Sequence, residues 1–206
     1  MGNTAAGKGA LVAFCGIDGC GKTTQLRLAE AWLAERGHTV VCTRQPTDSY
    51  RSHPAVRRYF RTNVAEGGML NLVRLSAEDR RRHIREVIDP ALADGDIVLC
   101  DRYYYSAEAF FFARGIAPGV VRELNRGVPK PLLTVYLDVP THVCRERILR
   151  RDGKWSSVEE QEPGFLDKVR AGFEGAADET FLKLDGRQSI AALHRQVKDH
   201  LQTALQ

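Results

Sequence analysis

The 206-residue sequence contains no long hydrophobic run, no paired cysteine motif and no polybasic tail. Its longest apolar runs have the length of single strands, whereas a membrane-spanning helix needs about 18 apolar residues. The start of the chain has neither the apolar core of a secretory signal nor the serine or threonine of a myristoylation site. These absences predict a soluble cytoplasmic protein with no membrane partner.

The cysteines and the charge exclude further classes of protein. The five cysteines are an odd number and include no C-x-x-C pair, so neither a disulfide framework nor a zinc site is expected. Cys15, Cys42 and Cys100 each close a short apolar run, where we expect free thiols that behave as small hydrophobic side chains. The formal charge is only +4, with 30 basic and 26 acidic residues. That balance predicts no nucleic-acid polymer as partner, and each basic cluster needs a local ligand or a solvated face.

Short apolar runs alternate with stretches of helical periodicity, and the chain has no internal repeat and no linker. Apolar strands separated by helices are typical of a parallel sheet that is covered on both faces. We therefore predict a disordered tail at 1–9 and one α/β domain over 10–206, a three-layer α/β/α sandwich around a five-stranded parallel sheet. The expected strands are 10–15, 39–43, 96–100, 132–137 and 180–184. The expected helices are 22–36, 71–93 with a bend near Pro90, 106–114, 118–125, 141–151, 162–172 and 189–205.

A glycine-rich stretch between the first strand and the first helix fits the phosphate-loop pattern G-x-x-x-x-G-K-[ST]. Its residues are Gly16, Ile17, Asp18, Gly19, Cys20, Gly21, Lys22, Thr23 and Thr24. Glycines allow backbone N–H groups to surround phosphate oxygens, and the following helix offers them its positive end. Lys22, expected on an exposed loop, would reach the β- and γ-phosphates, and the Thr23 hydroxyl would hold Mg²⁺. The pattern predicts binding of ATP or GTP, with a glycine-rich turn and a chance lysine as the alternative.

Other features narrow the reaction. The sequence has no N-K-x-D motif of the kind that reads guanine in GTPases, and 206 residues are few for a helicase or a transporter ATPase, so a small-molecule kinase fits best. The third strand leads into Asp101 and Arg102, at the sheet edge where parallel α/β proteins bind ligands. Asp101 would act on Mg²⁺ or its waters, or as the base for the attacking oxygen. Arg102 would neutralise charge on the transferred phosphoryl group, and a local ion pair is the alternative for both.

Several motifs together resemble the thymidylate kinase family, in the order in which that family carries them. They are F-x-G-x-D-G-x-G-K-T-T-Q from Phe14, T-R-Q-P from Thr43, A-E-D-R-x-x-H from Ala77, D-R-Y-x-x-S-x-x-A-F from Asp101, L-D-V from Leu137, K-V-R-A-G-F from Lys168 and L-D-G from Leu184. The resemblance covers about residues 10–200. It implies a P-loop nucleoside monophosphate kinase fold with a short lid at about 145–160. It also implies transfer of the γ-phosphoryl group of ATP to dTMP, and a homodimer.

The same resemblance implies a set of residues around the acceptor nucleotide. They are Asp18, Arg44, Arg80, Arg102, Ser106 and Phe110. Guanidinium forks suit phosphate oxygens, so Arg80 and Arg102 would grip a monophosphate, with a solvated helix face as the alternative for Arg80. Phe110 lies in a run of three phenylalanines, of which at least one belongs to the core. Of the tyrosines at 103–105, we expect only Tyr103 to face inward.

A basic stretch follows the fourth strand and forms the expected lid. Its basic residues are Arg145, Arg147, Arg150, Arg151 and Lys154. Arg147 and Arg151 are four residues apart and therefore share one helical face. Family members without an arginine in the phosphate loop supply it from the lid, and this loop has Gly19 and Cys20 instead. Arg147 and Arg151 are therefore expected to be catalytic residues of a lid that closes over ATP, with a solvated face as the alternative.

Three positions depart from the family pattern. Ser76 stands four residues before Arg80, where the family usually has a phenylalanine that stacks on thymine. Gln45 replaces the glutamate of R-E-P, and Ser157 stands where the lid usually carries an arginine. Two alternatives therefore accompany the prediction of a dTMP kinase. One is a deoxynucleoside kinase, which commonly has E-R-S where this chain has D-R-Y, and the other is a nucleotide-binding regulatory protein without catalysis.

Overall fold

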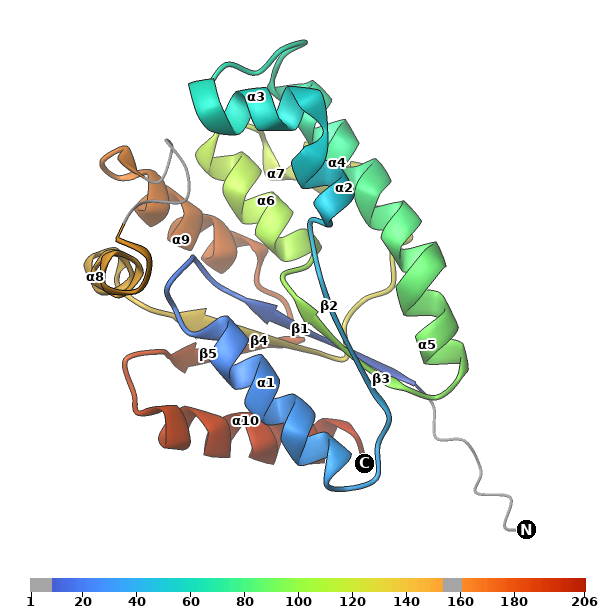
Figure 1. Ribbon diagram of the computed structural model, residues 1–206. Coiled ribbons are helices and arrows are strands. Elements are labelled where there is room, and N and C mark those ends of the chain that lie inside the picture. The colour runs from blue at the N-terminus through green and yellow to red at the C-terminus, as the bar shows by residue number, and fades with distance from the viewer. Residues whose placement is uncertain (1–8, 154–160) are drawn as a thin grey trace.

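A computed structural model describes residues 9–153 and 161–206 and arranges them in three layers (Figure 1). The central layer is a sheet of five parallel strands in the order β2-β3-β1-β4-β5. The strands are β1 (Ala10–Cys15), β2 (Val40–Arg44), β3 (Ile97–Asp101), β4 (Leu133–Asp138) and β5 (Phe181–Asp185). All five expected strands are present, so the predicted α/β fold class is confirmed. After β1, each strand begins and ends one residue later than expected, because the polar residue at its end still pairs with its neighbour.

Helices α1 and α10 cover one face of the sheet, and α5, α6 and α9 cover the other (Figure 1). The helices are α1 (Lys22–Ala34), α2 (Asp48–Ser52), α3 (Pro54–Thr62), α4 (Met69–His83), α5 (Asp89–Ala93), α6 (Tyr104–Ala113), α7 (Pro118–Leu124), α8 (Thr141–Asp152), α9 (Phe165–Ala176) and α10 (Ile190–Ala204). The segment predicted as one bent helix forms α4, a π-helical turn η1 (Ile84–Ile88) and α5. Pro90 lies in the first turn of α5, directly after the π-helical turn.

The central strands are apolar because both of their faces are covered. All six residues of β1 and the first four of β3 are buried, which is what apolar runs without alternation predict. β2 forms one edge of the sheet, and Cys42 on it is exposed, whereas Cys15 and Cys100 are buried. Cys42 is a free thiol as expected, but it lies at the surface, because an edge strand has a neighbour on one side only.

Helices α2 and α3 are absent from the sequence prediction and lie beyond the carboxyl end of β2 (Figure 1). Their sequence is short and rich in arginine and reads as a basic cluster, although Val56 and Tyr59 lie on one buried face of α3. A small second core joins them to α4, α6 and α7. It contains Tyr50, Val56, Tyr59, Leu72, Val73, Phe111 and Val121. This core holds the two helices above the sheet edge at which the phosphate loop begins.

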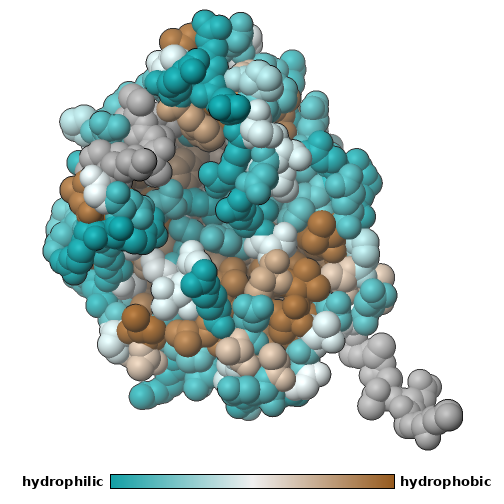
Figure 2. Space-filling view, viewed as in Figure 1, coloured by the Kyte–Doolittle hydropathy of each residue, from teal (hydrophilic) through white to brown (hydrophobic). Residues whose placement is uncertain are grey.

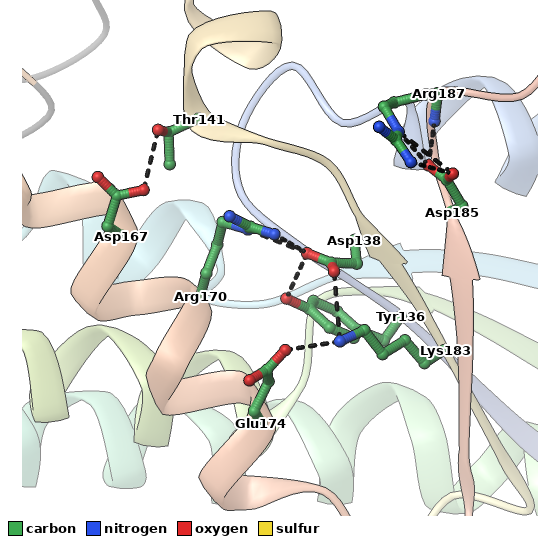
Figure 3. A network of polar contacts seen from close by, with 9 residues as sticks. All are labelled: Tyr136, Asp138, Thr141, Asp167, Arg170, Glu174, Lys183, Asp185 and Arg187. Carbon is green, nitrogen blue, oxygen red and sulfur yellow. Dashed lines mark hydrogen bonds and ion pairs between the residues drawn. The ribbon is translucent and has the colours of Figure 1, made fainter.

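Asp138 ends β4 and lies at the centre of a polar network (Figure 3). Its Oδ1 accepts a hydrogen bond from Arg170 Nη2 of α9 at 2.8 Å, and its Oδ2 lies 3.3 Å from Lys183 Nζ of β5. Lys183 also donates to Glu174 at 2.6 Å. Burial alone would raise the pKa of Asp138, but Arg170 and Lys183 hold it below its ordinary value. The L-D-V and K-V-R-A-G-F motifs therefore have a structural role, since this network ties α9 and β5 to β4.

Two of the three consecutive tyrosines face inward, not one. Tyr103 and Tyr105 are both buried. Tyr105 packs edge-on against the ring of Phe181 on β5, and its hydroxyl donates to Asp178 at 2.7 Å. The expectation that only Tyr103 faces inward is wrong because the helix α6 has apolar neighbours on the side of β5 as well.

Candidate active site

The phosphate loop joins β1 to α1, and its glycines adopt backbone conformations that other residues avoid. Gly16, Gly19 and Gly21 have φ angles of 139°, 81° and 104°. A Cβ atom on Gly19 would lie 2.6 Å from the carbonyl oxygen of Cys144 on α8, so a side chain there would displace that helix. Helix α1 begins without a side-chain cap. Its first N–H groups therefore remain available to an anion.

Lys22 lies inside the phosphate loop and is only 6% exposed. Its Nζ donates to the carbonyl oxygens of Gly16 at 3.1 Å and Ile17 at 3.0 Å, and lies 3.7 Å from Asp18 Oδ1. The expectation of an exposed lysine is wrong, because the loop wraps around the ammonium group and replaces its water with carbonyl oxygens. The loop thus keeps a positive charge at its centre.

The loop forms one wall of a pocket, called here the phosphate-loop pocket. The loop residues that line it are Asp18, Gly19, Cys20, Gly21, Lys22, Thr23 and Thr24. Gly16 and Ile17 do not line it and instead bind Lys22. The opposite walls come from Asp101, from α8 and from the segment that follows β5. The structure therefore brings the expected phosphate-binding residues together around one cavity.

Thr23 and Asp101 offer oxygen atoms to a cation in this pocket. Thr23 is exposed, and Asp101 Oδ1 is buried without a hydrogen-bond partner in the described part of the chain. A buried polar atom without a partner costs roughly 1–3 kcal/mol, so the position fits an ion or a water that the chain does not supply. Mg²⁺ in phosphoryl-transfer sites needs only one or two protein ligands, because phosphate oxygens and water complete its shell. The two residues therefore fit a magnesium site.

Arg147 and Arg151 line the phosphate-loop pocket from one face of α8, as their spacing predicts. Arg147 Nη2 donates to the carbonyl oxygen of Gly186 at 3.1 Å, and its Nη1 lies 3.4 Å from that of Gly19. One guanidinium thus joins α8, the phosphate loop and the segment after β5. Arg151 is exposed and pairs with its neighbour in sequence. The rest of the expected lid, from Lys154 to residue 160, lies outside the described residues.

A second pocket is lined by residues of α2, α3, α4 and α6, and is called here the arginine pocket. Its arginines are Arg51, Arg80, Arg102 and Arg114. Asp18 lines both pockets, whereas the adjacent Asp101 and Arg102 each line one. The two pockets therefore share an edge, made by the phosphate loop and the end of β3. Figure 2 shows a hollow below α3, with mostly hydrophilic residues around it.

Arg102 links the two pockets. Its Nη2 donates to Asp18 Oδ1 at 2.7 Å, and its guanidinium lies over the Phe110 ring, 4.9 Å from the centroid. Burial alone would lower the pKa of Arg102, but the carboxylates of Asp18 and Asp101 raise it above its ordinary value. Its Nη1 is buried and has no hydrogen-bond partner in the described residues. This atom is a donor ready for an anionic oxygen.

The backbone of Arg102 is strained. Its φ is 67°, a left-handed conformation that costs a residue with a Cβ roughly 1–2 kcal/mol. The hydrogen bond from its N–H to the carbonyl oxygen of Phe14, at 2.8 Å, holds this turn. This turn separates the side chains of Asp101 and Arg102, so that Asp101 lines the phosphate-loop pocket and Arg102 lines the arginine pocket. Strain of this kind concentrates at functional sites.

The arginine pocket brings together five of the six residues expected around the acceptor. They are Asp18, Arg80, Arg102, Ser106 and Phe110. Arg44 is not among the described residues that line it; its side chain is 56% exposed and pairs with Asp48. Side chains alternate along a strand, and the inward positions beside Arg44 belong to Thr43 and Gln45. Ser76 also lines the pocket, one helical turn before Arg80.

Sequence reasoning missed Tyr50, Phe60 and Arg114, which also line the arginine pocket. Tyr50 and Phe60 come from the helices that the sequence prediction lacks. The Arg114 guanidinium lies 5.2 Å from the ring centroid of Phe111 and 5.3 Å from that of Tyr59. The aromatic residues within an arginine-rich segment are the signal that could have identified this wall, because such rings stack on bases and on guanidinium groups.

Comparison with known proteins identifies the family. The thymidylate kinase family model matches residues 14–197. The chain belongs to the thymidylate kinase family. It is 36% identical to the probable thymidylate kinase of Archaeoglobus fulgidus over 95% of this chain and 96% of the relative. It is 34% identical to the thymidylate kinase of Geotalea uraniireducens, over 88% and 91% of the two chains. It is also 36% identical to the thymidylate kinase of Akkermansia muciniphila, over 93% of this chain and 92% of the relative.

Membership of the thymidylate kinase family confirms the resemblance seen in the motifs and the expected class of enzyme, a nucleoside monophosphate kinase. The family uses ATP as phosphoryl donor, as expected for this chain. The deoxynucleoside kinase and the regulatory protein are not favoured. Among residues 9–153 and 161–206, no helix is long and apolar enough to cross a membrane.

Proposed function

We propose that the protein is a thymidylate kinase that transfers the γ-phosphoryl group of ATP to dTMP and releases ADP and dTDP. The observation that carries this proposal is the shared edge of the two pockets, where Asp18 lines both while Asp101 and Arg102 line one each. Direct transfer requires the donor and acceptor phosphates to meet with water excluded. Two pockets that meet at one carboxylate and guanidinium pair suit that requirement.

The phosphate-loop pocket takes ATP. The backbone N–H groups after Gly21 and the ammonium group of Lys22 bind its phosphates. Lys22 exchanges the neutral carbonyl oxygens of the loop for charged phosphate oxygens, which are the stronger acceptors. Arg147 and Arg151 add positive charge from α8, where they stabilise the charge that develops during transfer.

Thr23 and Asp101 are the residues that would hold Mg²⁺, Thr23 through its hydroxyl and Asp101 directly or through water. When bound, the ion neutralises charge on the transferred phosphoryl group and orients it. The unpartnered Oδ1 of Asp101 supports this assignment. Asp101 would otherwise carry the cost of a buried acceptor with no role in folding.

The acceptor needs no general base. The second pKa of a phosphate monoester is about 6, so dTMP mostly carries a deprotonated oxygen at neutral pH. That oxygen attacks the γ-phosphorus, the bond from this phosphorus to the β,γ-bridging oxygen breaks, and ADP leaves with the electron pair. Because the attacking oxygen is already deprotonated, Asp101 is better assigned to binding Mg²⁺ than to acting as a general base. A deoxynucleoside kinase, whose acceptor is a hydroxyl, would need the base.

The arginine pocket takes dTMP. The free Nη1 of Arg102 offers a charge-assisted hydrogen bond to a phosphate oxygen, and Phe110 beneath its guanidinium keeps it in place. Arg80 adds a second guanidinium from α4. The rings of Tyr50 and Phe60 provide apolar faces for the nucleoside.

The proposal includes a homodimer and a cytoplasmic location. The homodimer rests on the resemblance to the family, and light scattering tests it; the mass of a single chain would contradict it. The free state of all five cysteines supports the cytoplasmic location, because oxidising compartments favour disulfides. Fractionation of cells that express the protein tests this second part.

A coupled assay of ADP release tests the proposed function. Purified protein with Mg-ATP is given a panel of nucleoside monophosphates and nucleosides, and Lys22→Ala protein controls for contaminating ATPase. We expect the highest kcat/KM with dTMP. Preference for thymidine over dTMP would favour the deoxynucleoside kinase, and no ADP with any acceptor would favour the regulatory protein.

A further inference from the structure

Three alternating residues at the end of β2 and in the following loop contact three residues of α4. The pairs are Thr43 with His83, Gln45 with both His83 and Arg80, and Thr47 with Asp79. The chain bends at Gln45 and Pro46, across a cis peptide bond, and the three helical residues share one face of α4. The loop and the helix are thus joined by buried and half-buried polar side chains directly beside the arginine pocket.

Arg80 is held at two of its nitrogen atoms. Its Nε donates to Gln45 Oε1 at 2.9 Å, and its Nη1 donates to Asn125 Oδ1 at 2.5 Å. Within the described residues its Nη2 makes no hydrogen bond, and the side chain lines the arginine pocket. Because a guanidinium is planar, two fixed nitrogens fix the direction of the third. The contacts therefore aim one edge of Arg80 at whatever occupies the pocket.

The N–H donors of Arg80 determine the orientation of the Gln45 amide and the tautomer of His83. A guanidinium can only donate, so the atom of Gln45 that faces it must be the oxygen, and the amide nitrogen must face His83. That nitrogen lies 3.0 Å from His83 Nδ1 and also only donates. Nδ1 must then be an acceptor without a proton. The proton of the neutral ring therefore sits on Nε2, which lies 2.7 Å from Thr43 Oγ1.

We propose that Gln45 and His83 are positioning residues that hold Arg80 ready for the acceptor nucleotide, and that they do so only while His83 is neutral. A proton on Nδ1 would face the amide N–H group of Gln45. The amide could relieve this only by turning over, which would point its N–H group at the Nε–H of Arg80. Protonation of His83 thus breaks the hydrogen bond that orients Arg80.

The surroundings of His83 favour its neutral form. The charged groups around it are Asp79 and Arg80 on α4 and Glu86 on η1, and the facing residues of the β2 segment, Thr43 and Gln45, are uncharged. Burial lowers the pKa of His83, the charge of Arg80 lowers it further, and Asp79 and Glu86 only partly oppose them. The ring is therefore neutral near pH 7, and acid is needed to disturb it.

Two substitutions of Gln45 test the proposal, which rests on the proposed function. Gln45→Leu removes both hydrogen bonds, and we expect dTMP to bind about tenfold more weakly by calorimetry, which corresponds to about 1.4 kcal/mol, with the Kd for ATP unchanged. Gln45→Glu keeps an acceptor for Arg80 and should restore most of that affinity. Thr134→Val is the matched control, because Thr134 is fully buried on β4 and bonds to Thr180 outside both pockets. It should lower stability without changing either Kd.

The pH dependence separates positioning from general stability. The phosphate of dTMP itself titrates at about pH 6, equally for both proteins, so the ratio of the two affinities is the informative quantity. In the wild type, protonation of His83 releases Arg80. With Gln45→Glu, the introduced carboxylate can accept from protonated Nδ1 and from Arg80 together. We therefore expect the wild type to lose affinity for dTMP relative to Gln45→Glu as the pH falls from about 7 to about 5.

Different results would overturn the inference and the proposed function. If the wild type binds dTMP and Gln45→Leu binds it equally well, or if the affinity ratio does not change with pH, the positioning role is wrong and the proposed function stands. If the wild type binds no dTMP, the proposed function is wrong. The ¹⁵N NMR spectrum of His83 in the free protein then decides the positioning role alone. A proton on Nε2 supports it, and a proton on Nδ1 at neutral pH overturns it.

Discussion

Replacing Arg102 tests the division of the site into two pockets. Arg102 lines the arginine pocket but not the phosphate-loop pocket, so Arg102→Ala should impair use of dTMP and spare ATP binding. The lost bond from Nη1 to an acceptor phosphate oxygen accounts for roughly 1.5–3 kcal/mol. Asp18 also loses the hydrogen bond from Arg102, and its carboxylate, which still lies 3.7 Å from Lys22 Nζ, then repels the phosphate more strongly. It is 40% exposed, so water limits this repulsion to about 1 kcal/mol.

The sum of about 2.5–4 kcal/mol corresponds to a loss of roughly 70- to 1,000-fold in kcat/KM for dTMP. The coupled assay measures this value, and calorimetry measures the Kd for ATP. Arg36→Ala is the matched control, because its guanidinium also lies over an aromatic ring, 4.1 Å from the centroid of Trp32, but outside both pockets. Its kcat/KM should equal that of the wild type. Equal losses of dTMP and ATP affinity in Arg102→Ala would refute the assignment of the two pockets.

Four further results are expected. Lys22→Ala should lower kcat by roughly 100- to 1,000-fold, because it removes a donor from the developing charge; near-normal turnover in a protein with a native circular dichroism spectrum would contradict the phosphate-loop assignment. Asp101→Asn should abolish Mg²⁺-dependent turnover and lower the free energy of unfolding in urea only slightly, because Asp101 Oδ1 has no hydrogen-bond partner to lose among the described residues and only the attraction of its charge to Arg102 is removed; a strong loss of stability would mean that the residue is structural. Ser76→Phe should tighten dTMP binding severalfold in calorimetry, since an aromatic face adds roughly 1 kcal/mol, and a complete loss of binding would indicate a bulkier acceptor. Burial lowers the pKa of both His83 and His194 below their ordinary 6.5, so the unfolded chain binds these protons more readily and stability should fall as the pH drops below 6.5. A His83→Leu protein should therefore show a smaller slope in urea unfolding, and an unchanged slope would exclude His83 as a source of it.

The parts of the fold that the sequence predicts are those with a local signal. The five strands are apolar runs, and the phosphate loop is a contiguous motif whose glycines and lysine have one structural purpose. Asp101 and Arg102 could be identified because they follow a buried strand. The left-handed turn at Arg102, which directs the two side chains to different pockets, has no counterpart in the sequence pattern.

The wall formed by α2 and α3 was missed because α2 has only 5 residues and because α3, although amphipathic, reads in the sequence as a basic cluster. The burial of Lys22 could not be predicted, because it depends on how the loop closes around it. Gln45 and His83 were both visible in motifs, yet 38 residues separate them. Only the packing of β2 against α4 shows that they contact each other and Arg80.

The central claim is the direct transfer of a phosphoryl group between two pockets that share an edge. It is tested most directly by incubating the protein with Mg-ATP labelled at the γ-phosphate and unlabelled dTMP, and by identifying the labelled product. The account predicts that the label appears in the terminal phosphate of dTDP, in amounts equal to the ADP formed, and that Arg102→Ala reduces both together. Label found only in inorganic phosphate, or dTDP formed without label, would contradict it.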